Sequence, residues 1–147
     1  METQRAMFTR PLVLSIFVSV GLELITFFFY ALMAETSHSL LTPFIWIVGF
    51  GGIGMGAVLG VLLDLILVGR VTAKDGIKGT ILLAALTMGV TAKLLTVNFA
   101  PVFHDLSGTN ALVYFISGVT TAIGSGFILG WLVFTEEGGR IADKLGV

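Results

Sequence analysis

The sequence predicts an all-α fold, specifically an integral membrane four-helix bundle built from two tandem, parallel-oriented two-helix repeats with a period of 70 residues. Composition is the first observation behind this prediction: 56% of the 147 residues are hydrophobic, 12% are charged, and the mean hydropathy is +1.03. A soluble domain of this size needs more charge to cover its surface. The other two observations are four long apolar runs and an internal repeat.

Four apolar runs are each long enough to cross the roughly 30 Å hydrocarbon core of a bilayer as a helix. The first run contains Glu23 and exceeds the apolar region of a cleaved signal peptide, so we interpret it as a retained helix. We expect a single transmembrane domain with repeat one at 1–70 and repeat two at 71–140. The expected spans are about 11–34, 43–69, 79–100 and 110–135, with loops at 35–39, 70–78 and 101–109 and a cytoplasmic tail at 136–147.

Basic residues predict the orientation. Of the eight Lys and Arg residues, seven fall before the first span, between the second and third spans, or after the fourth. Loops rich in Lys and Arg remain on the cytoplasmic side, so both termini are expected there, in a cell or inner membrane. The seven residues are Arg5, Arg10, Arg70, Lys74, Lys78, Arg140 and Lys144.

The internal repeat appears when the chain is compared with itself at an offset of 70. Ten of the 25 positions in 53–77 are identical to their counterparts in 123–147, and further matches occur upstream without a gap. Each copy would cross the membrane twice and return to the same side, so the copies would be related by a pseudo-two-fold axis along the membrane normal. The ten identical pairs are Ile53/Ile123, Gly54/Gly124, Gly56/Gly126, Leu59/Leu129, Gly60/Gly130, Leu62/Leu132, Gly69/Gly139, Arg70/Arg140, Lys74/Lys144 and Gly76/Gly146.

Glycines recur every four residues in both copies. Such spacing lets helix backbones approach closely within a membrane, where the hydrophobic effect does not drive helices together. The alternative is a narrow pore lined by glycine backbone. The glycines concerned are Gly52, Gly56 and Gly60 in the second span and Gly126 and Gly130 in the fourth.

Glu23 and Lys93 are charges deep within the first and third spans. Each would lie about 18–21 Å from the inner end of its helix, where a charged group costs on the order of 3 kcal/mol. They are 70 residues apart, so the sequence predicts that they pair, with Ser19, Thr26 and Thr96 as supporting polar groups. The pair would fix the two halves together, and the alternative is an ion or proton site at the midplane.

A second polar group is expected in the outer loops and has metal-ligand chemistry. Two histidines and two carboxylates could hold zinc or copper, but solvated loops commonly carry such residues, so we expect no metal and no other cofactor. The chain has no cysteine, and outside short loops it has no basic patch for nucleic acid. The four residues are Glu35, His38, His104 and Asp105.

The sequence shows no nucleophile–base pair and no motif that identifies a family, so no enzymatic activity is expected. We expect a structural or interaction subunit that packs through its glycine-rich faces into a membrane assembly, as a homo-oligomer or with other membrane subunits. The alternative is a small transporter or channel, for an ion or small molecule and possibly proton-coupled, that uses a midplane Glu23/Lys93 site.

Overall fold

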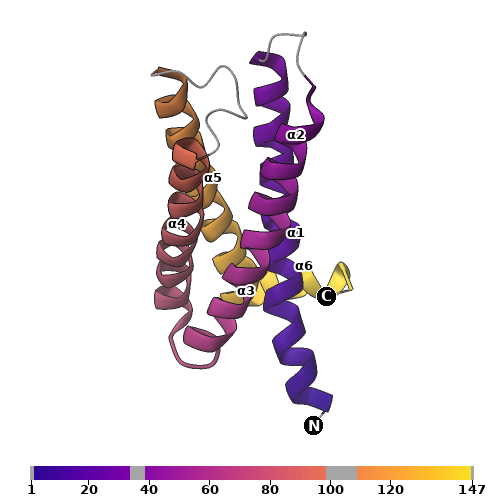
Figure 1. Cartoon of the computed structure of the whole chain (residues 1–147). Helices are drawn as coiled ribbons and strands as arrows, with labels where there is room; N and C mark the ends of the chain where they lie inside the picture. Colours follow the sequence, from indigo (N-terminus) through magenta and orange to yellow (C-terminus); the bar gives the residue numbers. More distant parts are fainter. Residues whose placement is uncertain (1, 34–38, 99–108, 147) are drawn as a thin grey trace.

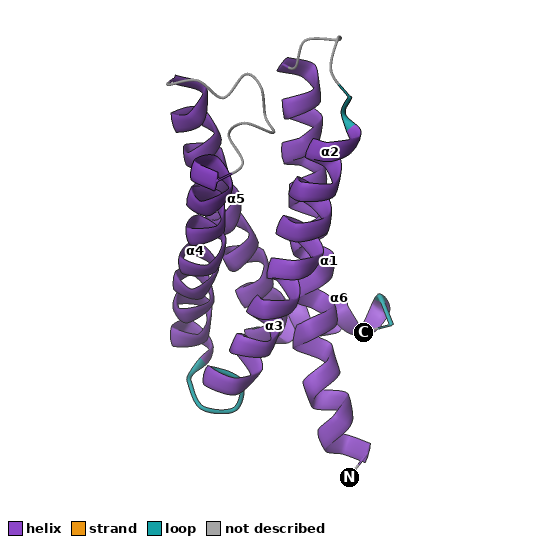
Figure 2. Ribbon diagram, viewed as in Figure 1, coloured by secondary structure: helices purple, strands orange, loops and turns teal. Residues whose placement is uncertain are grey.

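The computed structural model describes residues 2–33, 39–98 and 109–146, and within them the side chains of 10–32, 39–91, 115–116 and 118–146. Every regular element in these ranges is a helix, as predicted, and few residues lie in loops (Figure 2). In chain order the helices are α1 (Glu2–Met33), α2 (Leu41–Phe44), η1 (Ile45–Gly54), α3 (Met55–Ile66), α4 (Ala73–Asn98), α5 (Thr109–Phe134) and α6 (Glu136–Lys144).

Two helical segments in the described part of the chain are long and apolar enough to cross a membrane, namely Arg10–Leu32 and Leu41–Ile66. The second segment joins α2, η1 and α3 into one run. A third candidate combines Gly118–Phe134 with Glu136–Lys144, although these two helices meet at 91°. Large apolar side chains also face outward, with Phe17 71% exposed and Phe28 59% exposed. These features indicate a membrane protein.

The long helices form two adjacent hairpins (Figure 1). In the first hairpin α1 packs along η1 and α3, and in the second α4 packs along α5. The hairpins meet through α1 with α5 and through α3 with α4. The start of α1, the α3–α4 connection and α6 all lie at the same end of the molecule (Figure 1). The core draws on α1, α3, α4, α5 and α6, and its buried members are Leu14, Leu59, Leu63, Leu67, Ala84, Leu129, Leu132 and Ala142.

The spaced glycines of the second span bring its backbone against α1. A Cβ on Gly56 would lie 3.0 Å from the Cα of Ile16, and one on Gly60 would lie 2.7 Å from the Cα of Leu12. Real Cβ atoms essentially never come as close as the contact at Gly60, and the contact at Gly56 is tighter than most, so a larger residue would push the helices apart. Gly52 approaches the same helix, because its Cβ would lie 3.0 Å from the Cα of Val20.

The second hairpin uses its glycines in the same way. A Cβ on Gly126 would lie 2.6 Å from the Cα of Ile81, and one on Gly130 would lie 3.0 Å from the Cα of Ile77. These glycines follow their counterparts in the first hairpin by 70 residues. Their partners on α4, however, follow the corresponding partners on α1 by 65 residues, since 81 − 16 and 77 − 12 both equal 65. Helix packing therefore relates α1 to α4 by an offset of 65.

Two segments expected to be irregular are helical. The predicted inner loop at 70–78 is short, because α4 begins at Ala73. The Asp75 backbone N–H donates to the Thr72 hydroxyl at 3.4 Å and caps the helix, and the same hydroxyl donates to Asp75 Oδ2 at 2.9 Å. The segment predicted as a tail contains α6. Thr135 caps this helix, its side chain accepting a hydrogen bond from the Gly138 N–H at 3.0 Å. Thr at an N-cap is favoured because its hydroxyl accepts from a backbone N–H that has no partner within the helix.

Candidate functional site

Glu23 lies in the middle of the Arg10–Leu32 segment of α1 and contacts the second span. A Cβ on Gly51 would be 3.4 Å from both Cδ and Oε1 of Glu23, which is ordinary van der Waals contact. The carboxyl group therefore lies against the buried backbone of Gly51 in η1. A side chain larger than alanine at position 51 would have to displace it.

The backbone around Gly51 has an unusual conformation. η1 is a π-helix of ten residues, whereas the flanking α2 and α3 are ordinary α-helix. π-Helical turns are rare, and those that occur are frequently at functional sites. The segment reads IWIVGFGGIG, so four of its ten residues are glycines. Because these glycines have no side chain, Glu23 of α1 can contact the η1 backbone directly.

Ser15 and Ser19 lie on the same face of α1 as Glu23, at successive intervals of four residues. Both serines are fully buried. The Ser15 hydroxyl donates to the backbone oxygen of Gly56 at 2.7 Å, so this group is satisfied. The Ser19 hydroxyl has no hydrogen-bond partner among the described residues. This hydroxyl can therefore form a hydrogen bond to a ligand one helical turn from the Glu23 carboxyl group.

The polar face continues from α1 to α5. Thr26 donates to the Leu22 backbone oxygen at 3.1 Å, and its hydroxyl lies 3.2 Å from that of Thr121 on α5. One turn further along α5, the Ser125 hydroxyl is buried and has no partner within the described part of the chain. A buried polar group without a partner costs about 1–3 kcal/mol, so each of these two hydroxyls is a candidate to bind a water molecule or an ion.

The predicted partner of Glu23 lies in α4, but the side chains of Lys93 and Thr96 are outside the described residues. The pairing of Glu23 with Lys93 therefore stays a prediction. The pairing is predicted from the 70-residue spacing, which makes Glu23 and Lys93 equivalent positions. With the packing offset of 65, the residue equivalent to Glu23 is instead the buried Met88. Lys93 lies five residues beyond Met88, or about 7.5 Å further along the helix. The two charges are then not at matched positions of the two hairpins.

The four weak metal candidates, Glu35, His38, His104 and Asp105, lie outside the described residues. Among the residues that are described, no group of three or more His, Cys, Asp or Glu side chains could hold a metal ion. The predicted helix-packing glycines are all described, and each contacts the first helix of its own hairpin.

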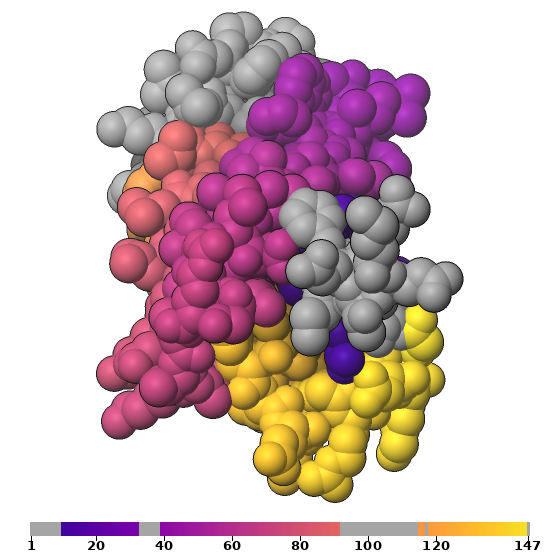
Figure 3. All heavy atoms as spheres, turned by 90° about the horizontal axis from the view of Figure 1, so that it is seen from below, coloured from indigo at the N-terminus to yellow at the C-terminus, as the bar shows by residue number. Residues whose placement is uncertain are grey.

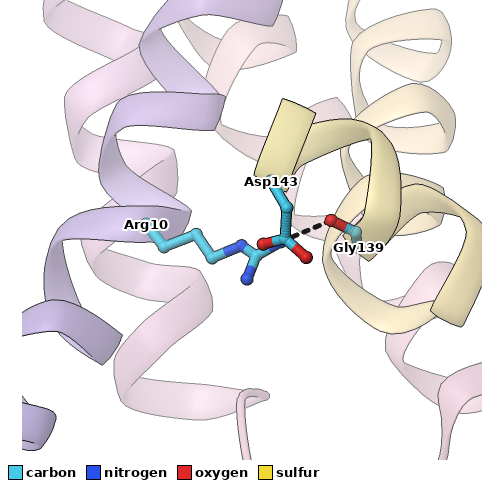
Figure 4. A network of polar contacts seen from close by, with 3 residues as sticks. All are labelled: Arg10, Gly139 and Asp143. Atoms are coloured by element: carbon cyan, nitrogen blue, oxygen red, sulfur yellow. Dashed lines mark hydrogen bonds and ion pairs between the residues drawn. The ribbon is translucent and has the colours of Figure 1, made fainter. Parts of the chain in front are cut away.

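Sequence reasoning missed a polar contact at the end of the molecule where α1 begins (Figure 4). Arg10 donates from Nη2 to the Gly139 backbone oxygen at 2.7 Å, and the same nitrogen lies 3.0 Å from Asp143 Oδ1. These contacts join α1 to α6. The sequence indicates only an orientation role for Arg10, because it does not predict a helix over 136–144. Gly51, Thr121 and Ser125 were also missed, and nothing in their spacing marks them out from other small residues in the spans.

The site therefore offers oxygen atoms from a carboxylate and hydroxyls, set in apolar surroundings among α1, η1 and α5. Oxygen groups of this kind suit a proton or a hard cation rather than a soft transition metal. No protein-family model, curated protein or solved structure matches the chain. The function has to be inferred from the geometry itself.

Proposed function

We propose that this chain is a small, non-catalytic membrane transporter or channel in which Glu23 binds a proton or a small monovalent cation within the bilayer. The observation that carries the proposal is the place of Glu23, in the middle of an apolar span with its carboxyl group against the Gly51 backbone. The described side chains give it no ion-pair partner; the ion pair they do contain joins Arg10 and Asp143.

The energetic argument starts from the cost of placing a carboxylate there. A charged residue at the centre of a membrane helix costs on the order of 3 kcal/mol, and such residues generally face the protein interior and mark ion or proton pathways. Binding a proton removes the charge, and binding a cation compensates it. Ser19 supports this reading, because its buried hydroxyl lies one turn from Glu23 and has no partner among the described residues.

The glycine contacts favour this function over an assembly subunit that packs through the same glycines. The faces containing Gly56 and Gly126 already contact α1 and α4 of the same chain. They are therefore not free to bind a neighbouring subunit. In the first hairpin, Gly52 and Gly56 allow α1 to pack closely against η1 and α3, and this packing places Glu23 beside Gly51.

Association with other membrane subunits or with a second copy remains a second candidate, through different glycines. A Cβ on Gly124 would meet nothing within 4 Å, and one on Gly54 would meet only atoms of its own helix. Both positions therefore have room for a neighbouring helix. This candidate predicts that Gly124→Leu breaks up an oligomer seen by native mass spectrometry in mild detergent, with the monomer fold intact.

We also propose that the chain forms a four-helix bundle of two parallel repeats, with both termini in the cytoplasm. A pseudo-two-fold axis that exchanges the hairpins would exchange the α1–α5 contact with the α4–α3 contact, and both contacts are present. In intact cells, a cysteine at Ser39 should react with an impermeant thiol reagent and one at Thr72 should not. Reaction at Thr72 alone would reverse the orientation.

Ion flux into vesicles tests the proposed function directly. The purified protein would be reconstituted in vesicles containing a pH-sensitive dye, and proton entry would be driven by a potassium diffusion potential; sodium entry would be followed with a sodium dye. Wild type should carry one of these ions, Glu23→Gln should not, and Glu137→Gln, exposed on α6, should behave as wild type. Flux of neither ion above empty vesicles, or equal flux in Glu23→Gln, would contradict the proposal.

A further inference from the structure

The helix α6 is amphipathic and lies at right angles to the helix before it. It meets the preceding helix at 91°, directly after Phe134. Seen from the end of the molecule at which α6 lies, the described C-terminal residues from about 120 to 146 (yellow) form one side of the surface (Figure 3). If α5 crosses the bilayer, as the proposed function requires, a helix at this angle runs along the membrane plane.

One face of α6 is fixed against the rest of the protein. Gly138 and Ala142 are four residues apart and both are buried. A Cβ on Gly138 would lie 2.6 Å from the Cα of Leu132, so the helix starts in close contact with the last turn of α5. Arg10 holds the same helix from another side through Gly139 and Asp143 (Figure 4). The orientation of α6 about its axis is therefore set by protein contacts.

This orientation leaves an apolar edge uncovered. Ile141 is 42% exposed and Leu145 is 68% exposed, and the four-residue spacing puts them on one face. At about 100° per residue, this face adjoins the buried Gly138–Ala142 face. The exposed Arg140 and Lys144 lie further round the helix, away from the buried face.

We propose that α6 is an interfacial helix whose Ile141–Leu145 edge inserts into the inner boundary of the same bilayer that the spans cross. An amphipathic helix in the interface buries its apolar face among the headgroups and upper acyl chains and keeps its charges in water. Lipid is supported as the occupant because α6 follows α5 at 91° and α5 itself carries exposed large apolar side chains, including Phe127 and Ile128. This inference rests on the proposed membrane bundle.

Spin labels on single cysteines test the inference, and the chain contains no native cysteine. Labels at Ile141, Leu145, Arg140 and Lys144 would be compared in vesicles of phosphatidylcholine and phosphatidylglycerol, using oxygen as the lipid-soluble relaxant and a nickel chelate as the water-soluble one. Labels at 141 and 145 should respond more to oxygen, and labels at 140 and 144 more to nickel. A label at Phe28, exposed on α1, reports whether the bundle itself is in the bilayer.

The outcomes separate failure of this inference from failure of the membrane bundle. Nickel access at 141 and 145 with oxygen access at 28 would overturn the interfacial helix alone. Nickel access at all three positions would overturn the membrane bundle as well. Protection of 141 and 145 from both relaxants would show that protein covers the edge, for example a second copy, and would also overturn lipid as its occupant.

Discussion

The carboxyl group of Glu23 lies against the backbone of Gly51, at a distance where a Cβ on Gly51 would just touch it. This contact joins an intramembrane acid to a π-helical segment of the next span. It also separates two properties that can be tested independently, namely the charge at position 23 and the space at position 51.

Gly51→Leu should abolish the ion flux attributed to Glu23 without changing any charge. The added side chain would occupy the volume of the carboxyl group and displace it from η1. Gly49→Leu is the matched control, since a Cβ there would meet only Ile45 of its own helix, at 4.0 Å. Flux measured in reconstituted vesicles should be lost in the first variant and kept in the second. Normal flux in a folded Gly51→Leu protein would show that the contact is incidental.

Gly56 and Gly126, which pack against a neighbouring helix, should not tolerate a larger side chain, whereas Gly124 should tolerate one. Leucine at Gly56 would overlap the backbone of α1, and leucine at Gly126 would overlap that of α4. Overpacking of this kind costs about 1–3 kcal/mol or more. A Cβ on Gly124 would meet no atom within 4 Å, so Gly124→Leu should be mild. The apparent melting temperature in detergent would show the difference. Equal tolerance at the three positions would be inconsistent with the packing described above.

Two buried serines on α1 should respond differently to alanine. Ser15→Ala removes a hydrogen bond to the Gly56 oxygen and should cost about 1 kcal/mol. Ser19→Ala removes a hydroxyl that has no partner among the described residues, so stability in detergent should be unchanged or slightly raised. Ser19→Ala should nevertheless weaken ion binding if the hydroxyl serves as a ligand. A large loss of stability in Ser19→Ala would mean that the hydroxyl has a structural partner after all.

The coupling between Glu23 and Lys93 distinguishes the two possible helix registers. The sequence offset of 70 predicts that the two residues meet, in which case removing both charges costs much less than the sum of the single changes. The packing offset of 65 places Lys93 about 7.5 Å further along its helix than the counterpart of Glu23. We therefore expect Glu23→Gln and Lys93→Met to be additive within about 0.5 kcal/mol. Strong non-additivity would support the ion pair between Glu23 and Lys93 and would weaken the proposal that Glu23 binds an ion.

Composition and the lengths of the apolar runs were sufficient to predict an all-helical membrane protein. The same applies to the close-packing role of Gly56 and Gly126, because small residues every four positions have a direct steric meaning. The helix α6 was missed although its signals are present: Thr135 is a favourable N-cap, acids follow it, and Lys144 lies in the last turn. The segment shares Gly69/Gly139, Arg70/Arg140 and Lys74/Lys144 with the predicted inner loop, and the repeat therefore favoured a tail without regular structure.

Neither the offset of 65 between α1 and α4 nor the π-helix η1 could be predicted from the sequence. Most of the identities that support an offset of 70 fall in 53–77 and 123–147, whereas the offset of α1 against α4 depends on the outer connections. Nothing in a run of small and apolar residues distinguishes π-helical from α-helical winding, so the contact between Glu23 and Gly51 could not be anticipated. The sequence located the acid but not its surroundings.

Carbodiimide labelling of Glu23 is the most direct test of the claim that this carboxyl group binds a proton or cation within the membrane. A hydrophobic carbodiimide modifies protonated carboxyl groups in apolar surroundings, and mass spectrometry of peptides locates the adduct. Glu23 should be modified, whereas the exposed Glu136 and Glu137 should not. Sodium should slow the modification if sodium is the bound ion, and the adduct should be absent in Glu23→Gln. If Glu23 stays unmodified at every pH and sodium concentration in a folded protein in lipid, Glu23 does not bind a proton or cation within the membrane.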